Sequence, residues 1–225
     1  GSSRVNSTEV NIPLDEIKNI AGSSVDVSFA EGYNKENVIS EKSINEAVNK
    51  AESSEVTILF TGLTEEYESE GYDRDNLKLP EEHIKLIKEV AKVQSNIVVV
   101  LSNGAPVKMN SWLKDVSAVL EGWLSGQAGG GAVADIIFGK VNPSGKLAET
   151  FPEKLKDSPS YLNFPGENEE VIYGERIFVG YRYYEKKKIE PLFPFGHGLS
   201  YTSFEYSNLK INKEEINESE SVELS

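Results

Sequence analysis

One charged loop holds the residues best suited to chemistry. It runs from Ser69 to Pro80 with the sequence SEGYDRDNLKLP, and it places the carboxyl of Glu70 directly before a glycine. The loop follows a short apolar run and precedes a strongly helical segment, and catalytic groups of α/β proteins often lie at strand ends. Because the chain has 37 acidic residues, a lone Glu in a loop is by itself most simply solvated surface. Glu70 therefore needs support from the rest of the chain.

The composition excludes several classes of function. A formal net charge of −14 and a pI near 4.7 disfavour nucleic acid and anionic membrane, since both need a basic surface, and favour a neutral ligand. The chain has no cysteine, so disulfides, thiolate chemistry and Cys-bound zinc are excluded. Its two histidines, His83 and His197, offer little material for a metal site or a Ser-His-Asp triad, and each is interpreted as a packing or surface residue. We expect no metal and no cofactor.

Nothing in the sequence indicates a membrane segment. There is no run of about 18 apolar residues, and the first residues, GSSRVNSTEV, lack the basic and apolar regions of a signal peptide. We expect a soluble chain whose compartment is open, with the cytoplasm favoured.

The elements that position the loop alternate between strand and helix patterns. Apolar runs predict strands at 25–29, 56–60, 96–102 and 117–123. Helical spacing predicts a short helix near residues 14–20, a helix from Ser43 with Glu46 placed for a capping box, a helix opened by Pro80, and one after the glycines of GQAGGG. This alternation predicts an α/β fold with a mostly parallel sheet of five or six strands sandwiched between helices.

Two further segments are candidates for sites. GQAGGG, residues 126–131, lacks the Lys-Ser/Thr of a P-loop and the spacing of a dinucleotide fingerprint, so close packing of a helix on the sheet is preferred. The C-terminal third is rich in aromatic side chains, which could line a sugar site but taken alone are better explained by packing; they are Tyr181, Tyr183, Tyr184, Phe193, Phe195, Tyr201 and Phe204.

Several strings together carry a family resemblance. In chain order they are SEGYDRDNLKLP, VVVLSNGAPV, W-x-x-GQ, ADIIFGKVNPSGKLAETFP, YGERIFVGYRYY and PLFPFGHGLSYTSFEY. Over about residues 1–208 the chain resembles the second domain of family-three glycoside hydrolases, the β-glucosidase group. One departure is Arg176, where many members have Gly.

The resemblance implies a retaining, exo-acting β-glucosidase-like enzyme acting on a β-linked glucoside or oligosaccharide. In such enzymes a barrel domain supplies an Asp nucleophile, and the α/β sandwich supplies the acid/base carboxyl from the Glu before Gly, which is Glu70 here. Glu68 is the alternative acid. Asp73 and Arg74 are expected to hold the loop, and Ser2 is a candidate for binding sugar hydroxyls.

The resemblance also bears on domain organisation. Residues 1–207 are expected to form the α/β sandwich with an aromatic-rich extension, lacking the family's first strand, and 208–225 a linker or the start of a fibronectin type III-like domain. The partners implied are the barrel, that first strand and the fibronectin-like domain, in the same polypeptide or as a second chain. We therefore expect this chain alone to be inactive. The alternative is a non-catalytic carbohydrate-binding or scaffold α/β domain.

Overall fold

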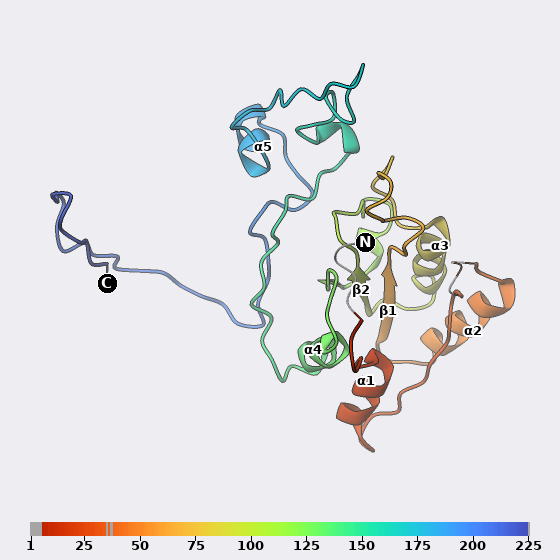
Figure 1. Cartoon of the computed structure of the whole chain (residues 1–225). Coiled ribbons are helices and arrows are strands. Elements are labelled where there is room, and N and C mark those ends of the chain that lie inside the picture. Colours follow the sequence, from red (N-terminus) through yellow and green to blue (C-terminus); the bar gives the residue numbers. More distant parts are fainter. Residues whose placement is uncertain (1–5, 35, 37, 225) are drawn as a thin grey trace.

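A short parallel sheet forms the centre of the computed structural model, which describes residues 6–34, 36 and 38–224 (Figure 1). Its strands are β1 (Thr57–Gly62), β2 (Ile97–Ser102) and β3 (Ala118–Glu121), in the order β1-β2-β3. The register aligns Leu59 with Val99, and Val99 in turn with Val119. These strands come from the continuous apolar runs of the sequence, as expected for parallel strands covered on both faces.

Helices cover both faces of this sheet (Figure 1). The helices α2 (Glu41–Glu52) and α3 (Glu81–Val90) pack together on one side, and α1 (Pro13–Ala21) packs against α4 (Gly129–Ile137) on the other. Side chains alternate along a strand, so β1 and β2 supply apolar groups to both layers. The α/β class and the parallel sheet between helices are confirmed.

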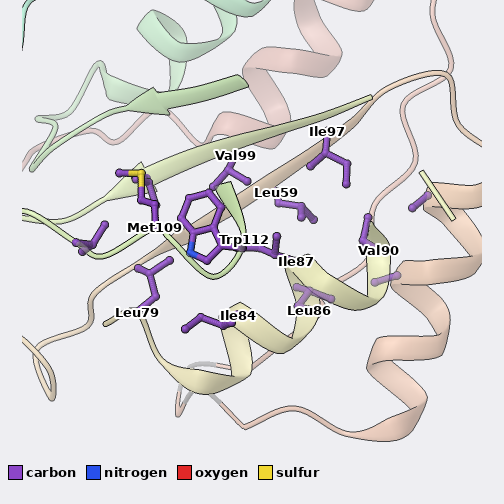
Figure 2. Packing of buried hydrophobic residues seen from close by; sticks show 14 of the residues in the cluster. Leu59, Leu79, Ile84, Leu86, Ile87, Val90, Ile97, Val99, Met109 and Trp112 are labelled. Atoms are coloured by element: carbon purple, nitrogen blue, oxygen red, sulfur yellow. The ribbon is translucent and has the colours of Figure 1, made fainter. Parts of the chain in front are cut away.

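The main core lies between the sheet and α2 and α3. Figure 2 shows Trp112, which is fully buried, among Met109, Val99 and Ile87. Trp112 directly precedes a short 3-10 helix, η1 (Leu113–Asp115). The segment after β2 therefore returns to the core beside Val99 of the same strand (Figure 2). This packing fixes the segment that leaves the carboxyl end of β2.

The number of strands was predicted wrongly. Among the described residues the sheet has three strands, not five or six. Residues 25–29 run outside any strand, with Val25 and Phe29 about half exposed. Their alternating pattern suits a strand, but a strand forms only where a neighbour supplies a hydrogen-bonding edge.

Two helix starts differ in detail from the sequence expectations. The helix α2 begins at Glu41, and its capping box joins Ser40 to Ser43 rather than using Glu46. Gly130 of α4 lies so close to the segment before α1 that a Cβ there would overlap the carbonyl oxygen of Asn11. Gly130 therefore does serve close packing, but against this segment rather than against the sheet.

The C-terminal third is less regular. It contains η2 (Leu155–Asp157) and α5 (Tyr181–Lys187), and two extended segments pair around Phe151 and Phe193. Arg176 has a φ of 51°, in the left-handed region that favours glycine, which gives a physical reason for the glycine of many family members. Residues 203–224 are exposed and run away from the rest of the molecule (Figure 1). The division at residue 207 stays a prediction.

No helix in the described part of the chain combines the length and the apolar character needed to cross a bilayer.

His83 of α3 is a packing residue, as expected. It is 1 % exposed, its ring lies 3.9 Å from that of Tyr33, and Nδ1 accepts a hydrogen bond from the backbone N–H of Gly62 at 3.4 Å. Burial lowers the pKa of His83 to about 4. The folded chain therefore keeps His83 neutral at pH values where the unfolded chain protonates it.

This difference predicts an acid-sensitive contribution to stability. Below the ordinary pKa of 6.5 the unfolded state binds a proton at His83 that the folded state does not. The contribution of His83 to the free energy of unfolding therefore falls as the pH drops from 6.5 to about 4, by about 3 kcal/mol in all. Urea unfolding of wild type and His83→Gln at pH 7, 5.5 and 4.5 measures it. We expect the variant to gain on wild type as the pH falls; a constant difference would contradict the buried neutral state.

Candidate functional site

The candidate site lies where all three strands end. The loop of residues 63–80 follows β1, the turn of Asn103 to Pro106 follows β2, and Glu121 is the last residue of β3. In parallel sheets the carboxyl ends of the strands share one edge, so these segments from distant parts of the sequence meet there.

Glu70 lies at the tip of a tight turn. An antiparallel bridge pairs Ser69 with Tyr72, which leaves Glu70 and Gly71 as the central residues, and the Gly71 N–H donates to Ser69 Oγ at 3.3 Å. The Tyr72 hydroxyl donates to the Glu65 carbonyl across the base of the loop. Glu70 is exposed. The fold thus places Glu70 as an exposed residue on a closed turn.

Glu68 is held in a different way. Its Oε2 accepts a hydrogen bond from the backbone N–H of Gly104 at 2.6 Å, and its Oε1 lies 4.0 Å from Nη1 of Arg74. The two side chains are only 23 % and 15 % exposed, respectively. Glu68 therefore joins the loop to the turn after β2.

Arg74 has Glu68 as its acidic neighbour. Nη1 of Arg74 also donates to the Pro106 carbonyl at 3.4 Å. Burial lowers the pKa of Arg74, and the charge of Glu68 partly offsets this. Asp73 is exposed. Of the two residues expected to hold the loop, Arg74 contacts the turn after β2.

Glu121 and Asn103 were missed as site residues. Asn103 is fully buried, and its Nδ2 donates to the Ala105 carbonyl at 3.0 Å and to Glu121 Oε2 at 3.3 Å. The Trp123 N–H donates to Glu121 Oε1 at 3.0 Å. Burial raises the pKa of Glu121 to about 7, and Glu68 adds to the rise. The one signal in the sequence was an acid inside the apolar run SAVLEGW.

The acids around Glu68 form a cluster. Glu149, from the segment after α4, has its pKa raised by burial and by the charge of Glu68. Among the residues that the structure describes, no group of three or more His, Asp or Glu side chains is arranged to hold a metal ion. The cluster is thus a place where carboxyls influence one another's protonation.

A cavity of about 490 Å³ opens beside this cluster. It separates Glu149 and Pro106 from the C-terminal third, where Tyr181 and Phe195 stack with their ring centroids 5.1 Å apart. Some of the aromatic residues thus line a cavity, while Phe193 packs on Phe151 in the core. Ser2 lies outside the described residues.

The chain is similar to glycoside hydrolases throughout its length. Residues 1–201 match the family model described as "Glycosyl hydrolase family 3 C-terminal domain". The thermostable beta-glucosidase B of Acetivibrio thermocellus is 55 % identical over 226 residues, which covers 100 % of this chain and 30 % of the relative. The exo-alpha-(1->6)-L-arabinopyranosidase of Bifidobacterium longum is 43 % identical over 214 residues, with coverages of 95 % and 28 %.

Solved structures agree. The crystal structure of a GH3 beta-glucosidase from Bifidobacterium adolescentis superposes with a TM-score of 0.88 at 45 % identity, covering 95 % of this chain and 31 % of that one. The beta-glucosidase 3B of Thermotoga neapolitana, solved with alpha-D-glucose, gives a TM-score of 0.79 at 33 % identity and covers 95 % of this chain and 34 % of its own. The chain spans about a third of the length of these proteins.

The partly buried acid Glu121 predicts a pH dependence opposite to that of His83. Between pH 4.5, the ordinary pKa of a Glu, and about pH 7 the folded state keeps a proton on Glu121 that the unfolded state has released. The contribution of Glu121 to the free energy of unfolding therefore falls as the pH rises through this range, by about 3 kcal/mol in all. Glu121→Gln is neutral at every pH. In urea unfolding at constant ionic strength, we expect its stability relative to wild type to rise from pH 4.5 to pH 8. A pH-independent difference would show that Glu121 ionises normally in the fold.

Proposed function

The chain belongs to glycosyl hydrolase family 3, and we propose that it supplies the general acid/base carboxyl, Glu70, of a retaining, exo-acting β-glucosidase-like enzyme. The observation that supports the proposal most is that the two carboxyls of this loop differ in their exposure and in their hydrogen bonds. Glu68 is half-buried and its Oε2 accepts the Gly104 N–H, whereas Glu70 sits exposed at the tip of the turn between Ser69 and Tyr72. A general acid must come within hydrogen-bonding distance of the oxygen that it protonates. Only an outward-facing carboxyl can reach a sugar bound by another domain.

The reaction needs a second carboxyl. In a retaining glycosidase the two carboxyls lie about 5 Å apart, one attacking the anomeric carbon while the other protonates the leaving oxygen. In the second step Glu70 takes a proton from a water molecule as that water attacks the anomeric carbon. The bond to the nucleophile breaks, which frees the nucleophile's carboxylate and leaves Glu70 protonated for the next cycle. We propose that the nucleophile is an Asp on a barrel domain outside these 225 residues. A (β/α)8 barrel needs about 250 residues of its own, which the longer relatives have room for.

The proposal assigns partners to two open surfaces. The β1 edge away from β2 has no strand partner among the described residues. On that edge the Tyr33 hydroxyl donates to the Phe60 carbonyl at 2.8 Å. A further strand of the polypeptide would pair along this edge, beside the extended residues 25–29. The C-terminal third exposes many large apolar side chains, a pattern that marks interfaces. We propose that it contacts the barrel and a fibronectin-like domain; examples are Ile172, Tyr173, Ile177, Leu199 and Phe204.

The proposed substrate is a β-linked glucoside or oligosaccharide, with no cofactor or metal. Support comes from the relatives named as beta-glucosidases. A relative named as an arabinopyranosidase is also 43 % identical over this region, so similarity at this level does not by itself fix which sugar is chosen. The alternative, a carbohydrate-binding or scaffold domain without catalysis, predicts sugar binding without turnover.

Replacing Glu70 tests the proposal in the complete enzyme. Glu70→Ala removes the proton donor, so kcat/KM should fall about 10²- to 10⁴-fold for glucosides with poor leaving groups and much less for dinitrophenyl glucoside. Azide should restore turnover of the activated substrate, because this anionic nucleophile needs no general base: it attacks the anomeric carbon of the glycosyl-enzyme in place of water, the bond to the Asp nucleophile breaks, and a glucosyl azide is released. Glu66→Ala, an exposed acid of the same loop, is the matched control and should leave the rates unchanged. Equal rates for Glu70→Ala and wild type would reject Glu70 as the acid.

The missing nucleophile gives a second test. Residues 1–225 expressed alone should release no nitrophenol from an aryl β-glucoside above the rate of buffer, because one carboxyl cannot complete a double displacement. Adding the barrel as a separate polypeptide should restore release if the two parts assemble. Turnover by the purified chain would overturn the division of the two carboxyls between domains.

A further inference from the structure

We propose that Glu68 is a positioning residue of the same reaction, which fastens the loop carrying Glu70 to the end of β2 through the backbone of Gly104. This inference rests on the proposed function and extends it, because it assigns the second carboxyl of the loop a task other than proton transfer. Glu68 lies two residues before Glu70, so any movement of Glu68 is passed to the turn that holds the acid.

The contact between Glu68 and Gly104 is short and closely fitted. Oε2 of Glu68 lies 2.6 Å from the Gly104 nitrogen, and a Cβ built on Gly104 would lie 3.1 Å from Oε1 and 3.2 Å from Oε2. A side chain at position 104 would therefore press on both carboxylate oxygens. Charge-assisted hydrogen bonds from a carboxylate to a backbone N–H are among the stronger ones. Gly104 leaves the space that lets Glu68 approach the main chain.

The fixed end of this connection is rigid. Asn103, fully buried, donates to the Ala105 carbonyl and to Glu121, so the residue before Gly104 is joined to β3. Leu101 of β2 is 0 % exposed in the core directly before this turn. Glu68 thus holds the loop against a turn that the sheet itself immobilises.

The loop end of this connection carries Glu70. Glu70 is exposed on a tight turn, in which the Gly71 N–H donates to Ser69 Oγ and a bridge pairs Ser69 with Tyr72. Arg74 adds a second attachment, at 3.4 Å to the Pro106 carbonyl, on the far side of the turn. A displacement of about 1 Å of a catalytic group can cost about 10²-fold in rate. Losing the Glu68 contact should therefore affect turnover more than substrate binding.

Charge surrounds Glu68 from several elements. Arg74 of the same loop faces it at 4.0 Å, and Glu121 of β3 and Glu149 after α4 both feel its charge. A neutral replacement of Glu68 removes that repulsion and should lower the pKa of both acids. The pKa values of Glu121 and Glu149 therefore report the loss of the Glu68 charge independently of the hydrogen bond to Gly104.

The kinetic test compares three variants in the complete enzyme. Glu68→Met keeps the size of the side chain but cannot accept the Gly104 N–H, Glu68→Gln keeps an acceptor, and Gly104→Ala presses on an unchanged Glu68. We expect Glu68→Met to lower kcat about 10- to 100-fold with little change in KM, Glu68→Gln to recover most of the loss, and Gly104→Ala to resemble Glu68→Met. Azide should rescue neither Glu68 variant, since Glu70 still fills its place.

Hydrogen exchange of residues 64–76 supplies the structural readout. Exchange should speed up in Glu68→Met and Gly104→Ala, and stay as in wild type in Glu68→Gln and Glu66→Gln. If Glu68 is instead the proton donor, Glu68→Gln will be as inactive as Glu68→Met and azide will rescue Glu68→Met. If kcat and exchange are unchanged in Glu68→Met, the positioning role is wrong.

The two proposals fail differently. An enzyme that hydrolyses no β-glucoside overturns the proposed function, while the exchange pattern still decides whether Glu68 fastens the loop. If Glu68→Met does not fold, Gly104→Ala tests the same contact from the other side. Hydrolysis that depends on Glu70 but not on Glu68 or Gly104 overturns the positioning role alone.

Discussion

The pairing of β2 on both of its edges is the constraint on which the rest of the structure depends. Its residues Ile97, Val99 and Leu101 are 0 % exposed, because β1 and β3 flank the strand and helical layers cover its faces. A shift of this strand by one residue would exchange the side chains that face its two helical layers, so the packing on both faces would have to change. The turn that leaves its carboxyl end is therefore placed by the core, and the loop after β1 is placed by that turn.

This arrangement carries a cost in electrostatics. Bringing Glu68, Glu121 and Glu149 near one strand end raises the pKa of the latter two, chiefly through burial. Burying an acid in this way disfavours its charged form and reduces stability at neutral pH. His83 has the opposite pH dependence, because its contribution to stability weakens in acid. Polar networks of this kind persist in a fold where they position something.

The sequence predicted those parts of the fold that depend on local pattern. The runs VTILF and NIVVVLS form β1 and β2, and the acids after Pro80 open α3 as expected. It failed at residues 25–29, since a strand requires a partner as well as a pattern. The exposure of Glu70 on a loop was readable from its neighbours. The contact between Glu68 and Gly104 joins residues 36 positions apart, and no local periodicity encodes such a contact.

Two carboxyls in one loop can serve one reaction only if their surroundings differ. Glu68 is partly buried and accepts a hydrogen bond from the main chain, whereas Glu70 is exposed to solvent at the tip of the turn. If the site is divided between two domains, as we propose, both conditions are necessary, because the acid must extend beyond its own domain and yet arrive in one place. In this proposal the exposed carboxyl of Glu70 meets the first condition. The buried sheet, acting through Gly104 and Glu68, meets the second.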